Sequence, residues 1–194
     1  MKAGFRTRPG LESAALLVAM ALGMTPPEAG AKVTTAGMAN FSVRLARHRS
    51  AKNICGDDRR TTFNFEVHVK NNDFAKAYTG LRGKLYAYAE RANQRGVYKM
   101  IKTECFRFDL PAKGKYAHAC APVTVKFDRR GTLKYGLKYK GYAVVVRDSK
   151  GNVVFADGSN KSFLRKLTAF ERLHEGAYFD RKLSCQQVRR GIYE

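Results

Sequence analysis

The sequence is poor in acidic residues, and this shortage argues against several kinds of enzyme. It holds 16 Asp and Glu among 194 residues, against 37 Lys and Arg. Its single adjacent acidic pair, Asp57 and Asp58, is followed directly by Arg59 and Arg60, which is typical of a turn with a local ion pair. The few other acids are scattered along the chain. The sequence therefore does not indicate two opposed carboxylates for general acid and base catalysis.

Motifs for nucleophilic catalysis, phosphate binding and metal binding are also absent. No G-x-S-x-G turn and no glycine-rich phosphate loop occurs. The four histidines, His48, His68, His118 and His174, show no H-x-x-x-H spacing, and the chain has no C-x-x-C. His118 and Cys120 are two positions apart, but structural zinc needs four convergent ligands. We expect no metal and no cofactor, and we expect the protein not to be an enzyme.

Long apolar runs are missing as well. The apolar run at residues 13–24 is about a dozen residues long, whereas a membrane-spanning helix needs roughly 20. It follows a basic segment, and it precedes two prolines and the small residues Ala29, Gly30 and Ala31. This three-part order predicts a secretory signal peptide over residues 1–31, cut before Lys32, with an N-terminal anchor as the alternative. We expect an exported protein, periplasmic or extracellular, without a membrane span.

What the sequence has in excess is positive charge. The formal net charge is +21, and removal of residues 1–31 would take away three basic and two acidic residues, leaving +20. Such a charge favours anionic partners: nucleic acid, lipid phosphate or acidic polysaccharide. Lysines also keep a protein soluble and protect edge strands, but mixed charges would serve that purpose equally well. Export makes nucleic acid the less favoured of the partners.

The chain has four cysteines, Cys55, Cys105, Cys120 and Cys185, all after the predicted cleavage site. An even number in an exported protein suggests two disulfides, and four cysteines allow three pairings. A turn at residues 111–114 that joins two antiparallel strands would bring Cys105 opposite Cys120. Four free, buried thiols are the alternative, and no feature marks one cysteine as an activated nucleophile.

Apolar and polar residues alternate with period two through much of the chain after residue 40. Seven strands are predicted, at residues 41–45, 63–69, 85–90, 97–108, 123–127, 142–146 and 152–156. A tight turn at residues 148–151 joins the last two. Short polar connections between such strands are typical of an antiparallel β-sandwich, here spanning residues 32–160.

The period changes after Gly158. Phe163, Leu167, Phe170 and His174 recur at helical spacing, with basic residues between them. This pattern predicts an amphipathic helix at residues 161–174, capped by Asn160 or Ser162 and ended by Gly176. The helix could lie on an anionic membrane, but we favour docking of its apolar stripe on the sandwich. We therefore expect residues 161–194 to form a C-terminal helix and tail packed on the sandwich.

Residues 137–146, LKYKGYAVVV, resemble the penultimate strand of a fibronectin type III or other immunoglobulin-like domain. In that family a Leu precedes a Tyr that begins a Y-x-V-x-V strand, and Val153, Val154 and Phe155 then resemble the last strand. The resemblance implies a seven-strand immunoglobulin-like sandwich with a C-terminal helix added. The chain departs from the family in having no Trp and in having Val144 where antibody domains carry a Cys. The fold hosts many roles, so the resemblance implies no particular function.

Basic and aromatic residues mix in the stretch RRGTLKYGLKYKGY at residues 129–142. We predict an anion-binding set made of Arg129, Arg130, Lys134, Tyr135, Lys138, Tyr139 and Lys140. A second basic set is Arg44, Arg47, Arg49 and Lys52. Together they predict an exported, non-catalytic envelope or secreted protein that binds an anionic polysaccharide or surface. The alternatives are a small secreted hydrolase acting on a polyanion and a nucleic-acid-binding protein.

Overall fold

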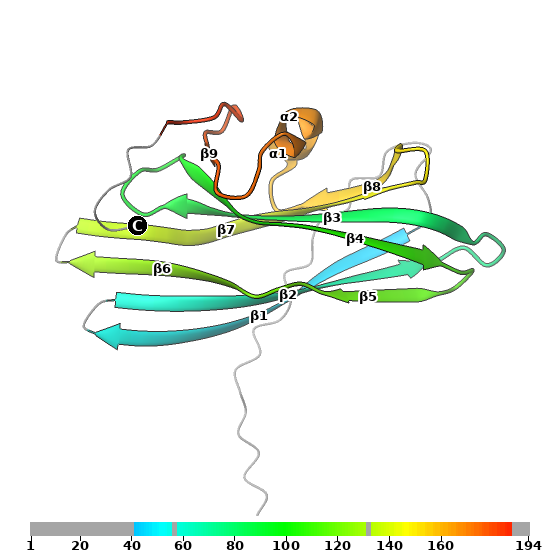
Figure 1. Ribbon diagram of the computed structural model, residues 1–194, viewed down its shortest axis with the longest axis horizontal. Helices are drawn as coiled ribbons and strands as arrows, with labels where there is room; N and C mark the ends of the chain where they lie inside the picture. The colour runs from blue at the N-terminus through cyan, green and yellow to red at the C-terminus, as the bar shows by residue number, and fades with distance from the viewer. Residues whose placement is uncertain (1–40, 56–57, 131–132, 188–194) are drawn as a thin grey trace, which may run out of the picture.

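Strands dominate the computed structural model, which describes residues 41–55, 58–130 and 133–187 (Figure 1). The predicted signal peptide lies outside these residues. Within them the chain forms nine strands and two short helices. The strands are β1 (Phe41–Cys55), β2 (Asp58–Asn71), β3 (Tyr78–Arg91), β4 (Tyr98–Leu110), β5 (Lys115–Ala119), β6 (Val123–Arg130), β7 (Leu133–Arg147), β8 (Val153–Gly158) and β9 (Tyr178–Phe179). The helices are α1 (Lys161–Arg165) and α2 (Leu167–Glu171), neither long and apolar enough to cross a bilayer.

The strands form one antiparallel path in the order β1-β2-β6-β7-β3-β4-β9, with β5 paired to β2 and β8 to β7. Strand β7 joins the two halves of this path, because residues 133–136 pair with β6 and residues 137–147 pair with β3. Figure 1 shows β1, β2, β5 and β6 below β3, β4, β7 and β8. Gly136, where β7 changes partner, has φ of +81°, and an added Cβ would lie 2.2 Å from the Lys126 carbonyl oxygen. A glycine is therefore required at this joint.

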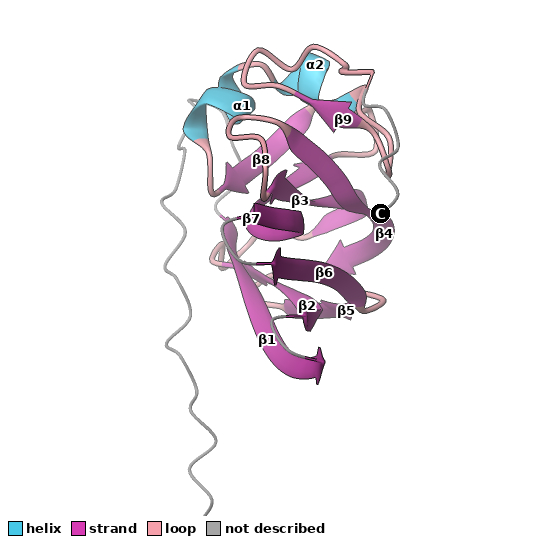
Figure 2. Ribbon diagram, turned by 90° about the vertical axis from the view of Figure 1, so that its left-hand side faces the viewer, coloured by secondary structure: helices cyan, strands magenta, loops and turns pink. Residues whose placement is uncertain are grey.

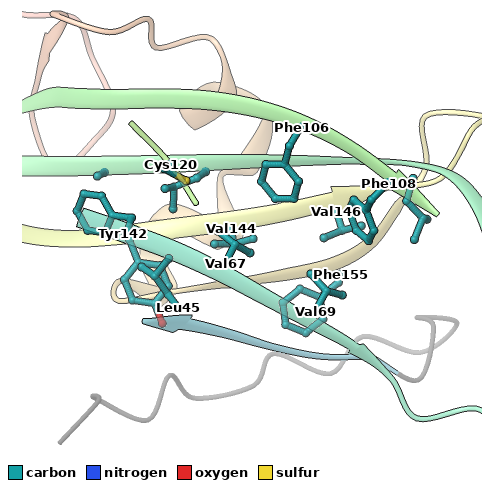
Figure 3. Close-up of a cluster of buried hydrophobic side chains, with 14 of the residues drawn as sticks. Leu45, Val67, Val69, Phe106, Phe108, Cys120, Tyr142, Val144, Val146 and Phe155 are labelled. Carbon is teal, nitrogen blue, oxygen red and sulfur yellow. The ribbon is translucent and has the colours of Figure 1, made fainter. Parts of the chain in front are cut away.

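The larger core lies between the two halves of the sheet. Val67 and Val69 of β2 are buried in the same cluster as Phe106 of β4, Val144 of β7 and Phe155 of β8 (Figure 3). The alternation predicted at residues 63–69 is confirmed, because its four odd-numbered side chains are buried. Each large apolar side chain buried in this way stabilises the fold by about 1.5–3 kcal/mol.

A smaller core covers the other face of β3, β4 and β7. Figure 2 shows α1 and α2 above β3 and β7. Phe163 of α1 and Phe170 of α2 are buried there against Tyr86 and Tyr88 of β3. The helix expected at residues 161–174 is instead two short helices, which meet at Lys166 with φ of −112° and ψ of 38°. Residues seven apart in a straight helix are separated by about 10.5 Å along its axis, whereas the rings of Phe163 and Phe170 stack 5.6 Å apart. The break lets both rings reach Tyr88.

The turn at residues 111–114 does not bring Cys105 opposite Cys120, so that prediction is wrong. Strand β5 pairs with β2, and Cys105 lies opposite Lys84 of β3. The turn carries the chain from one half of the sheet to the other, and the rings of Phe108 and Tyr116 stack 4.5 Å apart across it.

The cysteines whose side chains the structure describes are free thiols. Cys105 and Cys185 are exposed and Cys120 is buried. The side chain of Cys55 lies outside the described part. The two predicted disulfides therefore have no counterpart among the described side chains.

Asp157 of β8 is the one buried acid in the described part, with 4% of its surface exposed. Its Oδ1 atom has no hydrogen-bond partner. Burial raises the pKa of this carboxyl, and the Gly158 N–H, the Lys161 charge and Tyr142 only partly oppose the effect. The native state thus holds a proton at pH values where the unfolded chain has lost it. The contribution of Asp157 to the free energy of unfolding is greatest at acid pH, where the carboxyl is protonated in both states. This contribution declines as the pH rises through the raised pKa.

We expect Asp157→Asn to raise the melting temperature at pH 7, because an amide fills the same space without a charge to bury. The gain should disappear near pH 3, where the wild-type carboxyl is protonated in both states. Thermal unfolding of both proteins from pH 3 to pH 8 measures this. A difference that stays constant over the whole range would contradict the assignment.

Candidate anion-binding site

The basic stretch at residues 129–142 forms the end of β6 and the start of β7, so its side chains alternate between two faces. The side chains of Arg129 and Arg130 lie outside the described part. Lys134, Lys138 and Lys140 are exposed, whereas Tyr135 is half-buried. Tyr139 packs on the core, with its ring 4.8 Å from that of Phe63. The predicted set is therefore divided, and its members do not form one loop.

Two lysines of the set have partners of their own. Lys140 Nζ lies 3.0 Å from Glu90 Oε2, and Lys138 Nζ lies 4.8 Å from the centre of the Phe127 ring. Burial alone would raise the pKa of Glu90, but hydrogen bonds from the Gly96 N–H and Lys140 hold it below its ordinary value. Glu90 is thus ionised and joins β7 to the β3–β4 turn. The charge of Lys140 is partly neutralised there.

The second basic set lies on β1, an edge strand that pairs with β2 in the described sheet. Arg44, Arg47, Arg49 and Lys52 are all exposed. The Arg47 guanidinium carbon lies 4.7 Å from the centre of the Tyr139 ring, so the two predicted sets meet at this contact. Burial and repulsion from Arg59 and Arg47 lower the pKa of Arg49. Cations are therefore crowded at this end of β1 and β2.

A cavity of about 280 Å³ lies where β3, β4, β6, β7 and β9 come together. None of the described residues that line it is acidic. Its polar lining is Arg91, Asn93, Lys99, Thr124, Lys126, Tyr135 and Tyr178. We call this cavity the basic pocket. Three cationic side chains, Arg91, Lys99 and Lys126, line this concave site and create a positive potential that attracts anions.

Sheet pairing fixes the walls of the basic pocket. Lys99 of β4 lies opposite Tyr178 of β9, and its Nζ atom is 4.9 Å from the centre of that ring. The Arg91 guanidinium carbon lies 5.7 Å from the same ring. The Gly136 carbonyl accepts a hydrogen bond of 2.9 Å from the Ala92 N–H, which ties β7 to the β3–β4 turn. A ring positions both cations without cancelling their charge.

A second, more open cavity of about 500 Å³ borders the same turn. It is lined by Arg95, Gly96, Asp180, Arg181 and Lys182. Asp180 Oδ1 accepts hydrogen bonds from the backbone N–H groups of Lys182 and Ser184, at 2.7 and 3.0 Å. This acid thus caps its own turn. The open cavity thus places three further cations, Arg95, Arg181 and Lys182, beside the same turn.

Sequence reasoning found Tyr135 of this pocket and missed the three cations. Arg91, Lys99 and Lys126 are separate in the chain, and each is an ordinary outward-facing strand residue. Only the pairing of β3 with β4 and β7, and of β6 with β7, brings them together. No local pattern in the sequence carries that information.

The comparisons with known proteins do not identify a family for this chain. No family model matches the chain, and no curated protein matches it. The X-ray structure of a Northeast Structural Genomics Consortium target, SoR45, is similar at 11% identity and a TM-score of 0.28, covering 61% of this chain and 85% of that one. The crystal structure of the sporulation control protein Spo0M from Bacillus subtilis is similar at 16% identity and a TM-score of 0.26, covering 71% of this chain and 59% of that one. This chain therefore spans less than two thirds of the Spo0M chain.

Proposed function

We propose that this protein is an exported, non-catalytic envelope or secreted binding protein that contacts anionic surfaces. The observation that carries the proposal is the basic pocket, in which Arg91, Lys99 and Lys126 surround a concave site lined by no described acid. The targets are acidic polysaccharide, lipopolysaccharide or lipid phosphate, outside the cytoplasm. An immunoglobulin-like sandwich with a C-terminal amphipathic segment is the fold we propose with it.

The chemistry of the pocket suits binding without reaction. Its lining offers ammonium, guanidinium, hydroxyl and amide groups, all able to donate hydrogen bonds to sulfate, phosphate or carboxylate oxygens. No described lining residue is a His, Asp, Glu or Cys, the usual general bases and nucleophiles.

The size of the pocket points to one charged unit of a longer chain. Ligand pockets usually measure about 300–1,000 Å³, and this one, at about 280 Å³, is slightly smaller. The open cavity and the cations of β1 provide further positive surface. A polyanion could place one charged unit in the pocket and extend across that surface.

We expect binding to heparin and to lipopolysaccharide that weakens steeply as salt is raised. Three pocket cations that displace counterions give a slope of log affinity against log salt of about −2 to −3. Titrations at 50 and 200 mM salt measure it. Equal affinity at both concentrations would contradict the electrostatic proposal.

Two parallel measurements distinguish the alternative functions. Tighter binding to DNA than to heparin and lipopolysaccharide at the same salt would favour a nucleic-acid-binding protein. Shortening of the heparin chain on incubation, followed by gel filtration, would establish a hydrolase instead. We expect neither result.

A further inference from the structure

Three potential metal ligands meet away from the basic pocket, where β4 faces the end of β5. Glu104 is on β4, His118 is on β5, and Cys120 comes directly after β5. Their ligand atoms all lie within 4.8 Å of one another. His118 and Cys120 are two apart in extended chain, so their side chains share one face. Glu104, 14 residues before His118, approaches that face from β4.

Each of the three residues is held in place by a separate contact. The Cys120 N–H donates a 2.8 Å hydrogen bond to the Phe65 carbonyl. The His118 ring stacks on Phe106, with ring centres 4.6 Å apart and planes 17° apart. Glu104 Oε2 accepts hydrogen bonds from the Ala121 N–H and lies 3.1 Å from Lys102 Nζ. Such outer contacts orient ligands in known metal sites.

The second oxygen of Glu104 faces the histidine. Glu104 Oε1 lies 2.9 Å from His118 Nε2. Burial alone would raise the pKa of Glu104, but the hydrogen bonds from His118, Lys102 and Ala121 hold it below its ordinary value. The carboxylate is therefore ionised and presents one oxygen to the space shared with His118 and Cys120.

Cys120 is buried, with 7% of its surface exposed. Burial, and to a lesser extent the charge of Glu104, raise the pKa of its thiol to about 11. At neutral pH the group is a thiol, which is the opposite of an activated cysteine nucleophile. A metal ion would replace the thiol proton, releasing one H⁺ to solvent as the metal–sulfur bond forms.

We propose that Glu104, His118 and Cys120 bind a zinc-class divalent transition-metal ion. Thiolate sulfur, imidazole nitrogen and carboxylate oxygen are the ligands that Zn²⁺ takes in proteins. The charges of one thiolate and one carboxylate balance those of the ion. Three protein ligands leave the fourth tetrahedral position for water or a small ligand, as at reactive zinc sites. The inference is independent of the proposed anion binding.

A second histidine–glutamate pair in the molecule can be compared with His118 and Glu104. His68 and Glu66 of β2 form a similar pair, with His68 Nε2 3.4 Å from Glu66 Oε2. Both are more exposed than His118 and Glu104, and the described part places no cysteine in a metal-ligand group with them. A His–Glu contact alone therefore does not distinguish the proposed site; the buried sulfur does.

The test is a titration of the reduced, full-length protein with Co²⁺, whose thiolate complexes absorb in the near ultraviolet. We expect one equivalent to bind with a thiolate charge-transfer band, and Zn²⁺ to abolish the band by displacing Co²⁺. Cys120→Ser should remove the band, and His118→Gln should weaken Co²⁺ binding at least tenfold while keeping a side chain that can bond Glu104. Cys105→Ser, Cys185→Ser and His68→Ala should leave both unchanged.

Two results for the thiolate band would overturn the proposal. One is a wild-type protein without a thiolate band at saturating Co²⁺. The other is a band that persists in Cys120→Ser or disappears in Cys105→Ser. Cys120 is buried, and its replacement could unfold the chain. The His118→Gln titration is therefore a second test, and a circular dichroism spectrum shows whether that variant is folded. Unchanged Co²⁺ affinity in folded His118→Gln also counts against the site.

Discussion

Replacing Phe170 by alanine is expected to lower the free energy of unfolding by about 3–5 kcal/mol. Phe170 is completely buried at the centre of the smaller core. Its ring lies 5.1 Å from that of Tyr86, 5.6 Å from Phe163 and 6.2 Å from Phe179. Truncation would leave a cavity among aromatic side chains fixed by the sheet, which cannot collapse to fill it.

Urea unfolding followed by circular dichroism measures this loss, and Thr168→Ala is the matched control. Thr168 is an exposed residue of the same short helix, so its replacement should change stability by no more than about 0.5 kcal/mol. A loss below about 1 kcal/mol for Phe170→Ala would mean that residues 161–173 contribute little to the fold. The helices would then be an accessory to the sheet.

The β character of the chain could be predicted from the sequence because alternation is a local signal. Phe63, Phe65, Val67 and Val69 face the core as their spacing indicates. Strands β5 and β9 were not predicted. Strand β5, KYAHA, has no aliphatic residue larger than alanine and takes its inward positions from Tyr116 and His118. Strand β9 has two residues and is defined by its pairing with β4 and by a bridge from Phe179 to Cys185.

Local sequence patterns could not predict which strands pair with each other in the sheet. The turn at residues 111–114 predicts a reversal of the chain, and a reversal occurs. Whether the next strand pairs with β4 or crosses to β2 depends on contacts such as Phe108 with Tyr116, which form only in the folded sheet. The same limit hid the third member of the His118 and Cys120 set, Glu104.

For the candidate site, too, the sequence predicted composition but not which side chains come together. The sequence identified an excess of cations and a tyrosine, Tyr135, that lines the basic pocket. It also grouped Tyr139 with the exposed lysines, although the Tyr139 ring packs on Phe63 and Phe65. The inward face of β7 could not be assigned in advance, because the register shifts between Tyr88 and Ala89 on the neighbouring strand.

The second large effect is expected from removing the three cations of the basic pocket together. Arg91→Ala, Lys99→Ala and Lys126→Ala in one protein should weaken heparin binding about 100-fold. Each Lys or Arg close to an anionic surface contributes about 1 kcal/mol, and about 1.4 kcal/mol corresponds to a factor of ten. The salt slope should fall by about two to three at the same time, because fewer counterions are displaced.

A control variant with the same loss of charge distinguishes binding at the basic pocket from attraction by the net charge of the whole protein. Lys70, Arg82 and Lys150 are exposed and lie at the end of β2, the start of β3 and the β7–β8 turn. Figure 1 places these segments at the opposite end of the sheet from the β3–β4 turn. Alanine at all three positions lowers the net charge equally but leaves the basic pocket intact.

The most direct test of the account is therefore the ratio of the heparin dissociation constants of these two triple variants, measured by calorimetry at one salt concentration. We predict that the pocket variant binds at least 30 times more weakly than the control variant, which should stay within about threefold of wild type if binding is local. Equal weakening of both variants would contradict the account. The protein would then attract anions only through its net charge.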